Sequence, residues 1–380
     1  YCPSPLCLPS RSAFMAGKRV HEIQTYNNCN VNLYGKYPSY GEVLSRQGVY
    51  TVYIGKTDVY NAGQNLGFSE MIMEGDRSLP GDINFGREPL TIRKDAHERA
   101  NNFGPQEKPA RYKNDAKKVD AAIEWLTTKA ANLNQPWVVI VNIGNPHFPH
   151  WTTQELWDMY PEGGDLPKYG VECDSANHPY AKDLRAHFQT DLFTEEQIRG
   201  LRRGYLGCVT FVDQQLGRIM AALEKTGQMD NTNIIYTSDH GDMLGKFGMW
   251  WKCSLYEDSV RIPCIAAGPD FEAGKIVETP VDLLDVQAAI FKAVGAKRCE
   301  DWKGIPLQEI PQKDENRVIF SEYHGHGTRS GAYMVRKGNW KLIYYMKAPH
   351  QLFNLAEDPE ELNNLYEKYP EKAEELEREL

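Results

Sequence analysis

Several side chains that could bind an anion or a metal follow directly after apolar runs of the sequence. Lys56 follows the run 49–54, His147 follows the run 137–143, and Asp239 and His240 follow the run 233–237. Each of these side chains alone has an ordinary structural explanation, such as exposure to solvent or a hydrogen bond within a turn. Because ligands of an open parallel sheet bind beyond the carboxyl ends of its strands, we expect the four to converge on one cleft.

The residue types in this set indicate a divalent metal ion bound together with a tetrahedral oxyanion, either phosphate or sulfate. Asp239 and His240 offer an oxygen and a nitrogen ligand to a metal. Charged donors bind the oxygens of such an anion more strongly than neutral ones. The cationic donors that the sequence supplies are Arg11, Lys56, His147 and Lys252.

A cysteine at the start of an expected apolar helix is a candidate nucleophile. Cys7 precedes the helical stretch that we expect to extend through Ala13 to Gly17. The dipole and the free N–H groups of a helix N-terminus favour negative charge, which lowers the pKa of a thiol there. A plain thiolate beside a hard metal ion is an unusual pairing, however, because thiolates prefer softer metals.

The segment CLPSRSAFMAG, residues 7–17, resembles the C-x-P-S-R-x-x-x-x-x-G signature of the type I, formylglycine-dependent sulfatases. The segments 321–327 and 332–343 are similar to the branches that contain arylsulfatase K and choline sulfatase. The resemblance implies that a formylglycine-generating enzyme converts Cys7 to formylglycine, whose hydrate is the nucleophile. It also implies that Arg11 orients this hydrate.

The later motifs of the family fall in order along the chain. The resemblance implies that Lys56, His147 and Lys252 take part in catalysis and that Lys56 and Lys252 bind the sulfate. It implies that Asp239, His240 and the modified Cys7 hold Ca²⁺ or Mg²⁺. The sequence departs from the family at Asp58, where many members have a histidine, so the base that activates formylglycine stays open. We also expect the family's N-terminal metal-binding strand, which carries an Asp pair, to be missing from these residues.

The pattern of apolar runs predicts an α/β fold. The runs 49–54, 137–143, 233–237 and 262–267 are continuous, which is typical of strands covered on both faces. Helical patterns separate them, one over 115–131 and one from a capping box at Thr194 to about Gly227. We expect a mostly parallel central sheet flanked by helices, and the resemblance implies an alkaline-phosphatase-like fold. Residues 60–115 and 150–190 are expected to form long loops.

The pattern changes after about residue 305, where short antiparallel strands are expected around a hairpin turn at Lys337-Gly338-Asn339. We therefore expect a catalytic domain over 1–305 and a C-terminal subdomain over 306–380, with a small antiparallel sheet and a terminal helix. His324 follows the expected strand 318–321, so it either contacts substrate or bonds to the loop backbone. His150 and His326 are interpreted as structural. Trp250 and Trp251 either stack on a sugar or pack in the core.

Composition limits the classes of function. The net charge of −9 disfavours nucleic acid as a partner. No run of about 18 apolar residues is present, so we expect no membrane span. The eight cysteines are scattered without a C-x-x-C pair, which fits neither a zinc site nor a dense disulfide scaffold.

The expected function is therefore hydrolysis of a sulfate monoester, with a sulfated carbohydrate such as a 2-sulfated uronate, or a small organic sulfate, as substrate. One alternative is a phosphonate or phosphate ester hydrolase of the same superfamily. Another is a catalytically dead homologue that binds sulfated glycans. The resemblance implies a periplasmic or secreted protein in bacteria, or a lysosomal one.

Overall fold

The computed structural model describes residues 1–29, 36–59, 66–75, 81 and 86–380. The strands are β1 (Tyr50–Lys56), β2 (Glu70–Gly75), β3 (Phe103–Pro105), β4 (Trp137–Asn142), β5 (His150–Thr152), β6 (Ile234–Thr237), β7 (Cys264–Ala267), β8 (Val318–Tyr323), β9 (Ala332–Lys337), β10 (Trp340–Tyr345) and β11 (Gln351–Asn354). The helices are α1 (Cys7–Ala16), α2 (Val20–Ile23), α3 (Tyr40–Ser45), α4 (Ala110–Thr128), α5 (Gln154–Asp158), α6 (Asp174–Asn177), α7 (Pro179–Phe188), α8 (Glu195–Lys225), α9 (Glu257–Val260), α10 (Leu283–Ala293) and α11 (Pro370–Glu377).

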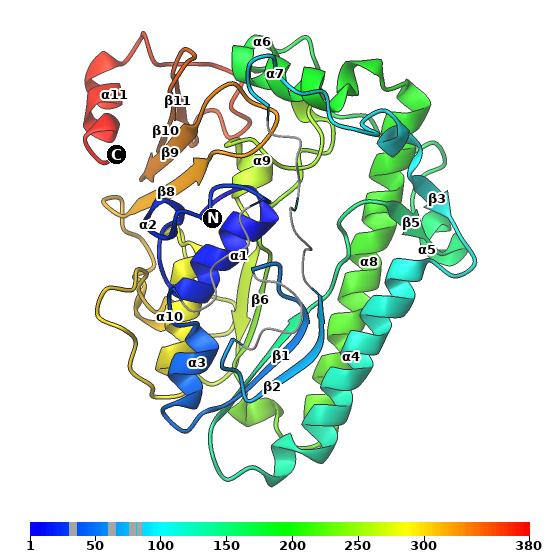
Figure 1. Cartoon of the computed structure of the whole chain (residues 1–380), viewed down its shortest axis with the longest axis vertical. Helices are drawn as coiled ribbons and strands as arrows, with labels where there is room; N and C mark the ends of the chain where they lie inside the picture. Colours follow the sequence, from blue (N-terminus) through cyan, green and yellow to red (C-terminus); the bar gives the residue numbers. More distant parts are fainter. Residues whose placement is uncertain (30–35, 60–65, 76–80, 82–85) are drawn as a thin grey trace.

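A parallel sheet of three strands, in the order β2-β1-β4, lies between two layers of helices (Figure 1). Val52 and Ile54 of β1 pack against α4 and α8, whereas Tyr53 packs with α1, α3 and α10 on the opposite face. Successive side chains of a strand point to opposite faces, so the continuous apolar run of β1 is what a strand covered on both sides requires. The expected layered α/β fold is confirmed.

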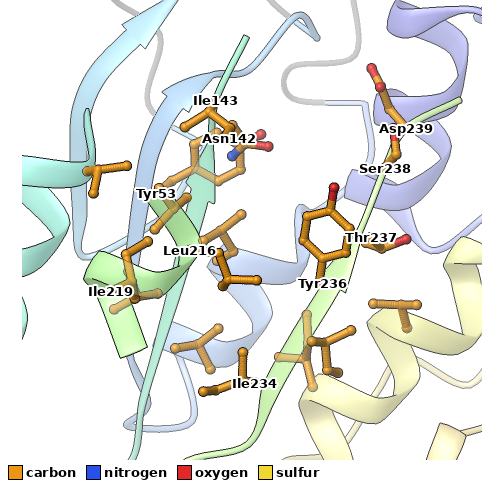
Figure 2. A pocket seen from close by; sticks show the side chains of 18 of the residues that line it. Tyr53, Asn142, Ile143, Leu216, Ile219, Ile234, Tyr236, Thr237, Ser238 and Asp239 are labelled. Atoms are coloured by element: carbon orange, nitrogen blue, oxygen red, sulfur yellow. The ribbon is translucent and has the colours of Figure 1, made fainter. Parts of the chain in front are cut away.

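The strand pair β6-β7 borders a groove instead of continuing this sheet. β6 and β7 are antiparallel, and within the described residues β4 pairs only with β1 and β6 only with β7. Our expectation that 262–267 is a buried strand is wrong, because β7 is largely exposed. The cavity between β4 and β6 has a volume of about 1220 Å³. Figure 2 shows Tyr236 of β6 on one side of this groove, with Leu216 and Ile219 of α8 on the other.

A second sheet, antiparallel and in the order β11-β10-β9-β8, lies at one end of the molecule beside the N-terminal residues (Figure 1). The hairpin β9-β10 turns at Gly338 and Asn339, where Gly338 has a φ of +56° that suits glycine. The expected antiparallel C-terminal sheet is thus confirmed. The division into domains at residue 305 stays a prediction.

The two segments expected to be long loops contain more regular structure than the sequence indicates. Within 60–115, the structure has β2, β3 and the first turn of α4, which begins at Ala110 and not near residue 115. Within 150–190, it has β5 and the helices α5, α6 and α7. These helices and strands are short or packed on one face only, so the segments are polar in composition and their sequence does not indicate regular structure. Residues 60–65, 76–80 and 82–85 lie outside the described part.

Helix α8 follows the sequence expectation closely. The Thr194 hydroxyl accepts a hydrogen bond from the Gln197 N–H, and the Gln197 side chain accepts one from the Thr194 N–H, so the expected capping box is present. In the described part of the chain, no helix is long and apolar enough to cross a membrane.

Candidate active site

Cys7 is the first residue of α1 and is 2% exposed. Its Sγ lies 3.2 Å from Nε2 of His240. Burial raises the pKa of the thiol, but the positive charges of Lys252, Lys56 and His240 outweigh burial and hold this pKa well below its usual value. The expected position at a helix N-terminus is confirmed, and it favours an anion on this side chain.

The turn that follows β6 carries Asp239 and His240 to Cys7. The Ser10 hydroxyl donates to the Asp239 carbonyl over 2.7 Å, and Nε of Arg11 donates to Asp239 Oδ2 over 2.7 Å. Burial raises the pKa of Asp239, yet the charges of Arg11 and His240 hold it well below its ordinary value. The carboxylate is therefore ionised, and α1 fixes both Cys7 and this metal-ligand candidate.

Cys7, Asp239 and His240 fit part of a metal coordination shell. Their ligand atoms all lie within 4.8 Å of one another. Nδ1 of His240 lies 2.9 Å from the Gly241 carbonyl. A histidine that binds a metal must be neutral, and with its proton on Nδ1 donated to this carbonyl, His240 would offer the Nε2 lone pair to the ion. One carboxylate, one imidazole and one anionic side chain suit a divalent ion.

Lys56 ends β1 and approaches the same site from the parallel sheet. Its Nζ lies 3.2 Å from Oδ2 of Asp58, which is buried. Gly55 has a φ of +94°, and a Cβ there would lie 2.2 Å from the carbonyl oxygen of Asn142. Only glycine therefore allows β1 to approach β4 this closely at the point where Lys56 enters the site.

His147 and Lys252 form a direct contact in the site. Nζ of Lys252 lies 2.8 Å from Nε2 of His147, and Nδ1 of His147 lies 2.7 Å from the Phe148 carbonyl. Burial, followed by the charge of Lys252, lowers the pKa of His147 to about 3. The ring is therefore neutral, with its proton on Nδ1 and its Nε2 accepting from Lys252.

A turn in an unusual backbone conformation holds Lys252. Its neighbours Trp251 and Cys253 have φ values of +64° and +80°. Asp242 accepts from the Trp251 N–H over 3.0 Å, and the Cys253 N–H donates to the Pro5 carbonyl over 3.0 Å. Such left-handed conformations cost energy for residues with a Cβ and persist where surrounding contacts impose them.

The structure brings the other predicted residues together, whereas the contacts of the His324 side chain are with a different set of residues. Its Nε2 lies 2.8 Å from Oε2 of the buried Glu322, and its ring packs edge-on against Tyr26 and Tyr333. Among the contacts within the described residues, none joins His324 directly to Cys7, Arg11, Lys56, His147, Asp239, His240 or Lys252. Its role in substrate binding stays a prediction.

Several residues that could have served the substrate are part of the core. Trp250 and Trp251 are each 2% exposed, so they pack and do not present a face to a sugar. His150 is fully buried with its Nδ1 3.1 Å from the Leu201 carbonyl, and His326 is also buried. These two histidines are structural, as the sequence led us to expect.

The sequence did not point to two residues that position the site. Asp115 of α4 accepts hydrogen bonds from the N–H groups of Gly144 and Asn145 and so fixes the loop that carries His147. Asn142 accepts from Nη1 of Arg11 over 3.1 Å. Asn142 is the polar end of an apolar strand, so the strand-end rule that found Lys56 could have found it. Asp115 gave no such signal.

Comparison with known proteins agrees with this geometry. The family model named Sulfatase matches residues 1–296, and the model of the C-terminal region of N-sulphoglucosamine sulphohydrolase matches residues 245–380. Choline-sulfatase of Rhizobium meliloti (strain 1021) is 31% identical, over 97% of this chain and 74% of its own length. Arylsulfatase K of Danio rerio is 28% identical, over 100% of this chain and 74% of its own length.

Solved structures agree in fold. A phosphonate monoester hydrolase from Silicibacter pomeroyi superposes with a TM-score of 0.77 at 21% identity, covering 100% of this chain and 86% of its own. A 2-O GAG sulfatase superposes with a TM-score of 0.73 at 23% identity, covering 99% and 81% of the two chains. The family model spans most of the chain, and the cysteine, the carboxylate and the cations of its motifs meet at one point. The chain therefore belongs to the sulfatase family, whose members hydrolyse sulfate esters.

Proposed function

We propose that this chain hydrolyses a sulfate monoester with a formylglycine nucleophile formed from Cys7. The observation that carries the proposal is the environment of Cys7, at the start of α1 and 3.2 Å from Nε2 of His240. Lys56 and Lys252 already lower the pKa of its thiol. The same cations would stabilise negative charge on an oxygen at this position.

The maturation partner that the proposal requires is a formylglycine-generating enzyme. Hydration of the aldehyde places two hydroxyl groups on one carbon. One hydroxyl gives its proton to a base and attacks the sulfur, the bond between the sulfur and the substrate oxygen breaks, and the alcohol leaves with a proton. The second hydroxyl then loses its proton, the bond to the sulfate oxygen breaks, and the aldehyde is regenerated.

Lys252 and His147 are suited to supply the proton that the leaving alcohol takes up. The neutral His147 ring accepts at Nε2 from the Lys252 ammonium, so the proton is held between the two side chains. A group that carries this proton close to the leaving oxygen acts as a general acid. We assign to Asp58 the role of orienting Lys56, with which it is paired.

Asp239, His240 and the converted Cys7 are the residues that would hold Ca²⁺ or Mg²⁺. Conversion replaces the sulfur of Cys7 by oxygen, which suits hard cations better. When bound, the ion would neutralise charge on the sulfate oxygens. Ca²⁺ takes roughly six to eight oxygen ligands, so further ligands are needed.

We propose that an extended segment seated in the groove between β4 and β6 supplies further ligands. Both flanking strands have an unpaired edge within the described residues, and the groove walls are more apolar than polar. Figure 2 shows Asn142 and Asp239 at the same end of the groove. An apolar strand could pair with both edges, and carboxylates at its end would then approach Asp239. Such a segment would correspond to the family's metal-binding strand with its Asp pair, which we expect to be missing from residues 1–380.

For the substrate, we favour a sulfated sugar such as a 2-sulfated uronate. Supporting this choice are the relatives named Arylsulfatase K and the fold of a 2-O GAG sulfatase. We assign His324, which the buried Glu322 orients, to the substrate rim. A small alkyl sulfate is the second candidate, because Choline-sulfatase is similarly related. We infer a periplasmic, secreted or lysosomal location.

The first test is the mass of the Cys7 peptide from full-length protein made in its native host. Formylglycine at residue 7 supports the proposal, whereas an unmodified thiol in a host with the maturation enzyme contradicts it and favours a glycan-binding homologue without activity. The second test compares sulfate release from sulfated sugars with phosphonate or phosphate release from matched esters. Faster phosphonate hydrolysis would identify a phosphonate ester hydrolase instead.

A further inference from the structure

A buried charge cluster outside the active site joins distant parts of the chain. Glu257, the first residue of α9, lies with Oε1 2.9 Å from Nζ of Lys341 on β10. Its Oε2 accepts a hydrogen bond from the hydroxyl of Tyr1 over 2.7 Å. Nζ of Lys341 also lies 2.7 Å from Oε1 of Glu361, and Oε2 of Glu361 accepts from the Glu257 N–H over 2.7 Å. The Lys341 and Glu361 side chains are 0% exposed.

The backbone of α9 contacts the turn that carries the metal-ligand candidates. The N–H of Gly241, which follows His240, donates to the Ser259 carbonyl over 2.8 Å. A Cβ at Gly241 would lie 2.0 Å from the carbonyl oxygen of Asp258, so the two segments are in direct backbone contact. Any displacement of α9 must therefore move the turn at Asp239 and His240.

We propose that Glu257 is a positioning residue for the metal site. Glu257 bonds to Lys341 of the C-terminal sheet and to Tyr1, six residues before Cys7. These two bonds hold α9 in place, and α9 in turn holds the turn that carries Asp239 and His240. A buried carboxylate held by an ammonium and a hydroxyl keeps one geometry, because breaking the pair would leave a buried charge unpaired. This inference rests on the metal site of the proposed function.

The test is the stabilisation of the full-length protein by Ca²⁺, measured as the melting temperature against Ca²⁺ concentration. For Glu257→Gln we expect the Ca²⁺ concentration that gives half of the full stabilisation to rise about tenfold, as for other residues that orient metal ligands. The matched control is Asp258→Asn, on the same helix, whose carboxylate pairs with Lys246 near the surface. Asp258→Asn should leave this Ca²⁺ concentration unchanged even if it lowers the melting temperature.

A milder variant covers the case in which Glu257→Gln does not fold. Tyr1→Phe removes only the hydroxyl, which donates to Glu257 and accepts from Nη1 of Arg336, and we expect a shift of about threefold in the same direction. The inference is wrong, and Glu257 is only structural, if both variants fold and keep the wild-type Ca²⁺ dependence. The same conclusion holds if only Tyr1→Phe folds and this variant keeps the wild-type Ca²⁺ dependence. A wild-type protein that neither Ca²⁺ nor Mg²⁺ stabilises would instead contradict the metal site itself.

Discussion

The Lys252 ammonium lies 2.8 Å from Nε2 of His147, and the two side chains come from loops 105 residues apart in the sequence. Because His147 uses its Nδ1 proton for the Phe148 carbonyl, only Nε2 is left to accept from Lys252. The contact therefore defines one tautomer and one protonation state in the free site. A neutral histidine beside a charged lysine forms a proton-donating pair next to Cys7.

This protonation state predicts a pH dependence of stability. The pKa of His147 is about 3 in the folded protein, below the value of about 6.5 in an unfolded chain. The folded state therefore binds this proton less readily, so His147 favours folding fully above pH 6.5 and progressively less as the pH falls towards 3. We expect the melting temperature of His147→Gln to decrease less than that of wild type between pH 7 and pH 4. Equal slopes would mean that His147 is protonated in the folded protein.

The role of Cys7 predicts a loss of activity without a loss of fold. Cys7→Ala should lower kcat/KM for a sulfate ester on the order of 10⁴-fold, because alanine has no sulfur or oxygen on Cβ from which the aldehyde could form. The control is Cys173→Ser, a half-buried cysteine beside Glu172, which should keep wild-type activity. Sulfate release and circular dichroism of both variants check this. Activity retained in Cys7→Ala would exclude Cys7 as the source of the nucleophile.

The sequence predicted the residues of the site better than the contacts that hold them. Lys56 and His147 follow apolar strands, and the ends of parallel strands meet at one edge of a sheet, so their convergence could be predicted. Lys252 follows no strand, so the sequence offered it only as a cationic donor, and its place in the site came from the family resemblance. Its position depends on the left-handed conformations of Trp251 and Cys253, which residue type does not indicate. Long-range hydrogen bonds impose that turn.

The expectations about the fold were wrong where the amino-acid composition of a segment does not determine which strand it pairs with or where a helix begins. The run 262–267 is apolar, but an apolar run does not reveal whether a strand is parallel, antiparallel or at an edge, and β7 is an exposed antiparallel strand. The first turn of α4 was missed because its residues are polar. Buried charges such as Lys341 and Glu361 also resemble surface residues in sequence. Only their partners from distant segments make burial tolerable.

Asp115 predicts an effect on catalysis from a helix outside the site. Each oxygen of Asp115 accepts from one backbone N–H, so in Asp115→Asn the new NH₂ group faces the N–H of either Gly144 or Asn145. We expect the free energy of unfolding to fall by about 2 kcal/mol, because buried donors lose their acceptor. We expect kcat to fall about tenfold, since the loop that carries His147 moves.

Asp120→Asn is the matched control for Asp115, on the same helix but with an exposed carboxylate that pairs with Arg218. Exposed ion pairs contribute roughly 0–1 kcal/mol, so this variant should keep both stability and kcat. Denaturant unfolding and steady-state kinetics measure the two effects. A stable Asp115→Asn variant with wild-type kcat would show that the loop that carries His147 holds its shape without this carboxylate.

The buried cluster around Lys341 predicts a second pH dependence, of opposite sign to that of His147. Burial raises the pKa of Glu361, Lys341 lowers it and Glu257 raises it, and the resulting value is about 7. An unfolded glutamate has a pKa of about 4.3. The folded state therefore holds this proton more tightly, so the group favours folding most at acidic pH, and this contribution is lost as the pH rises from about 4.5 towards 7. The ionisable groups that act on Glu361 or feel its charge are Lys341, Glu257, Lys246, Tyr256 and Tyr345.

Glu361→Gln mimics the protonated state at every pH and tests this directly. We expect its melting temperature to match that of wild type near pH 5 and to exceed it at pH 8, where the wild-type carboxyl is ionised against Glu257. Glu360→Gln is the control, because its neighbouring carboxylate is half-exposed and pairs with Lys246 outside the buried cluster. This control should follow the wild-type pH profile. If Glu361→Gln also follows it, Glu361 is ionised throughout this range and Lys341 neutralises both carboxylates.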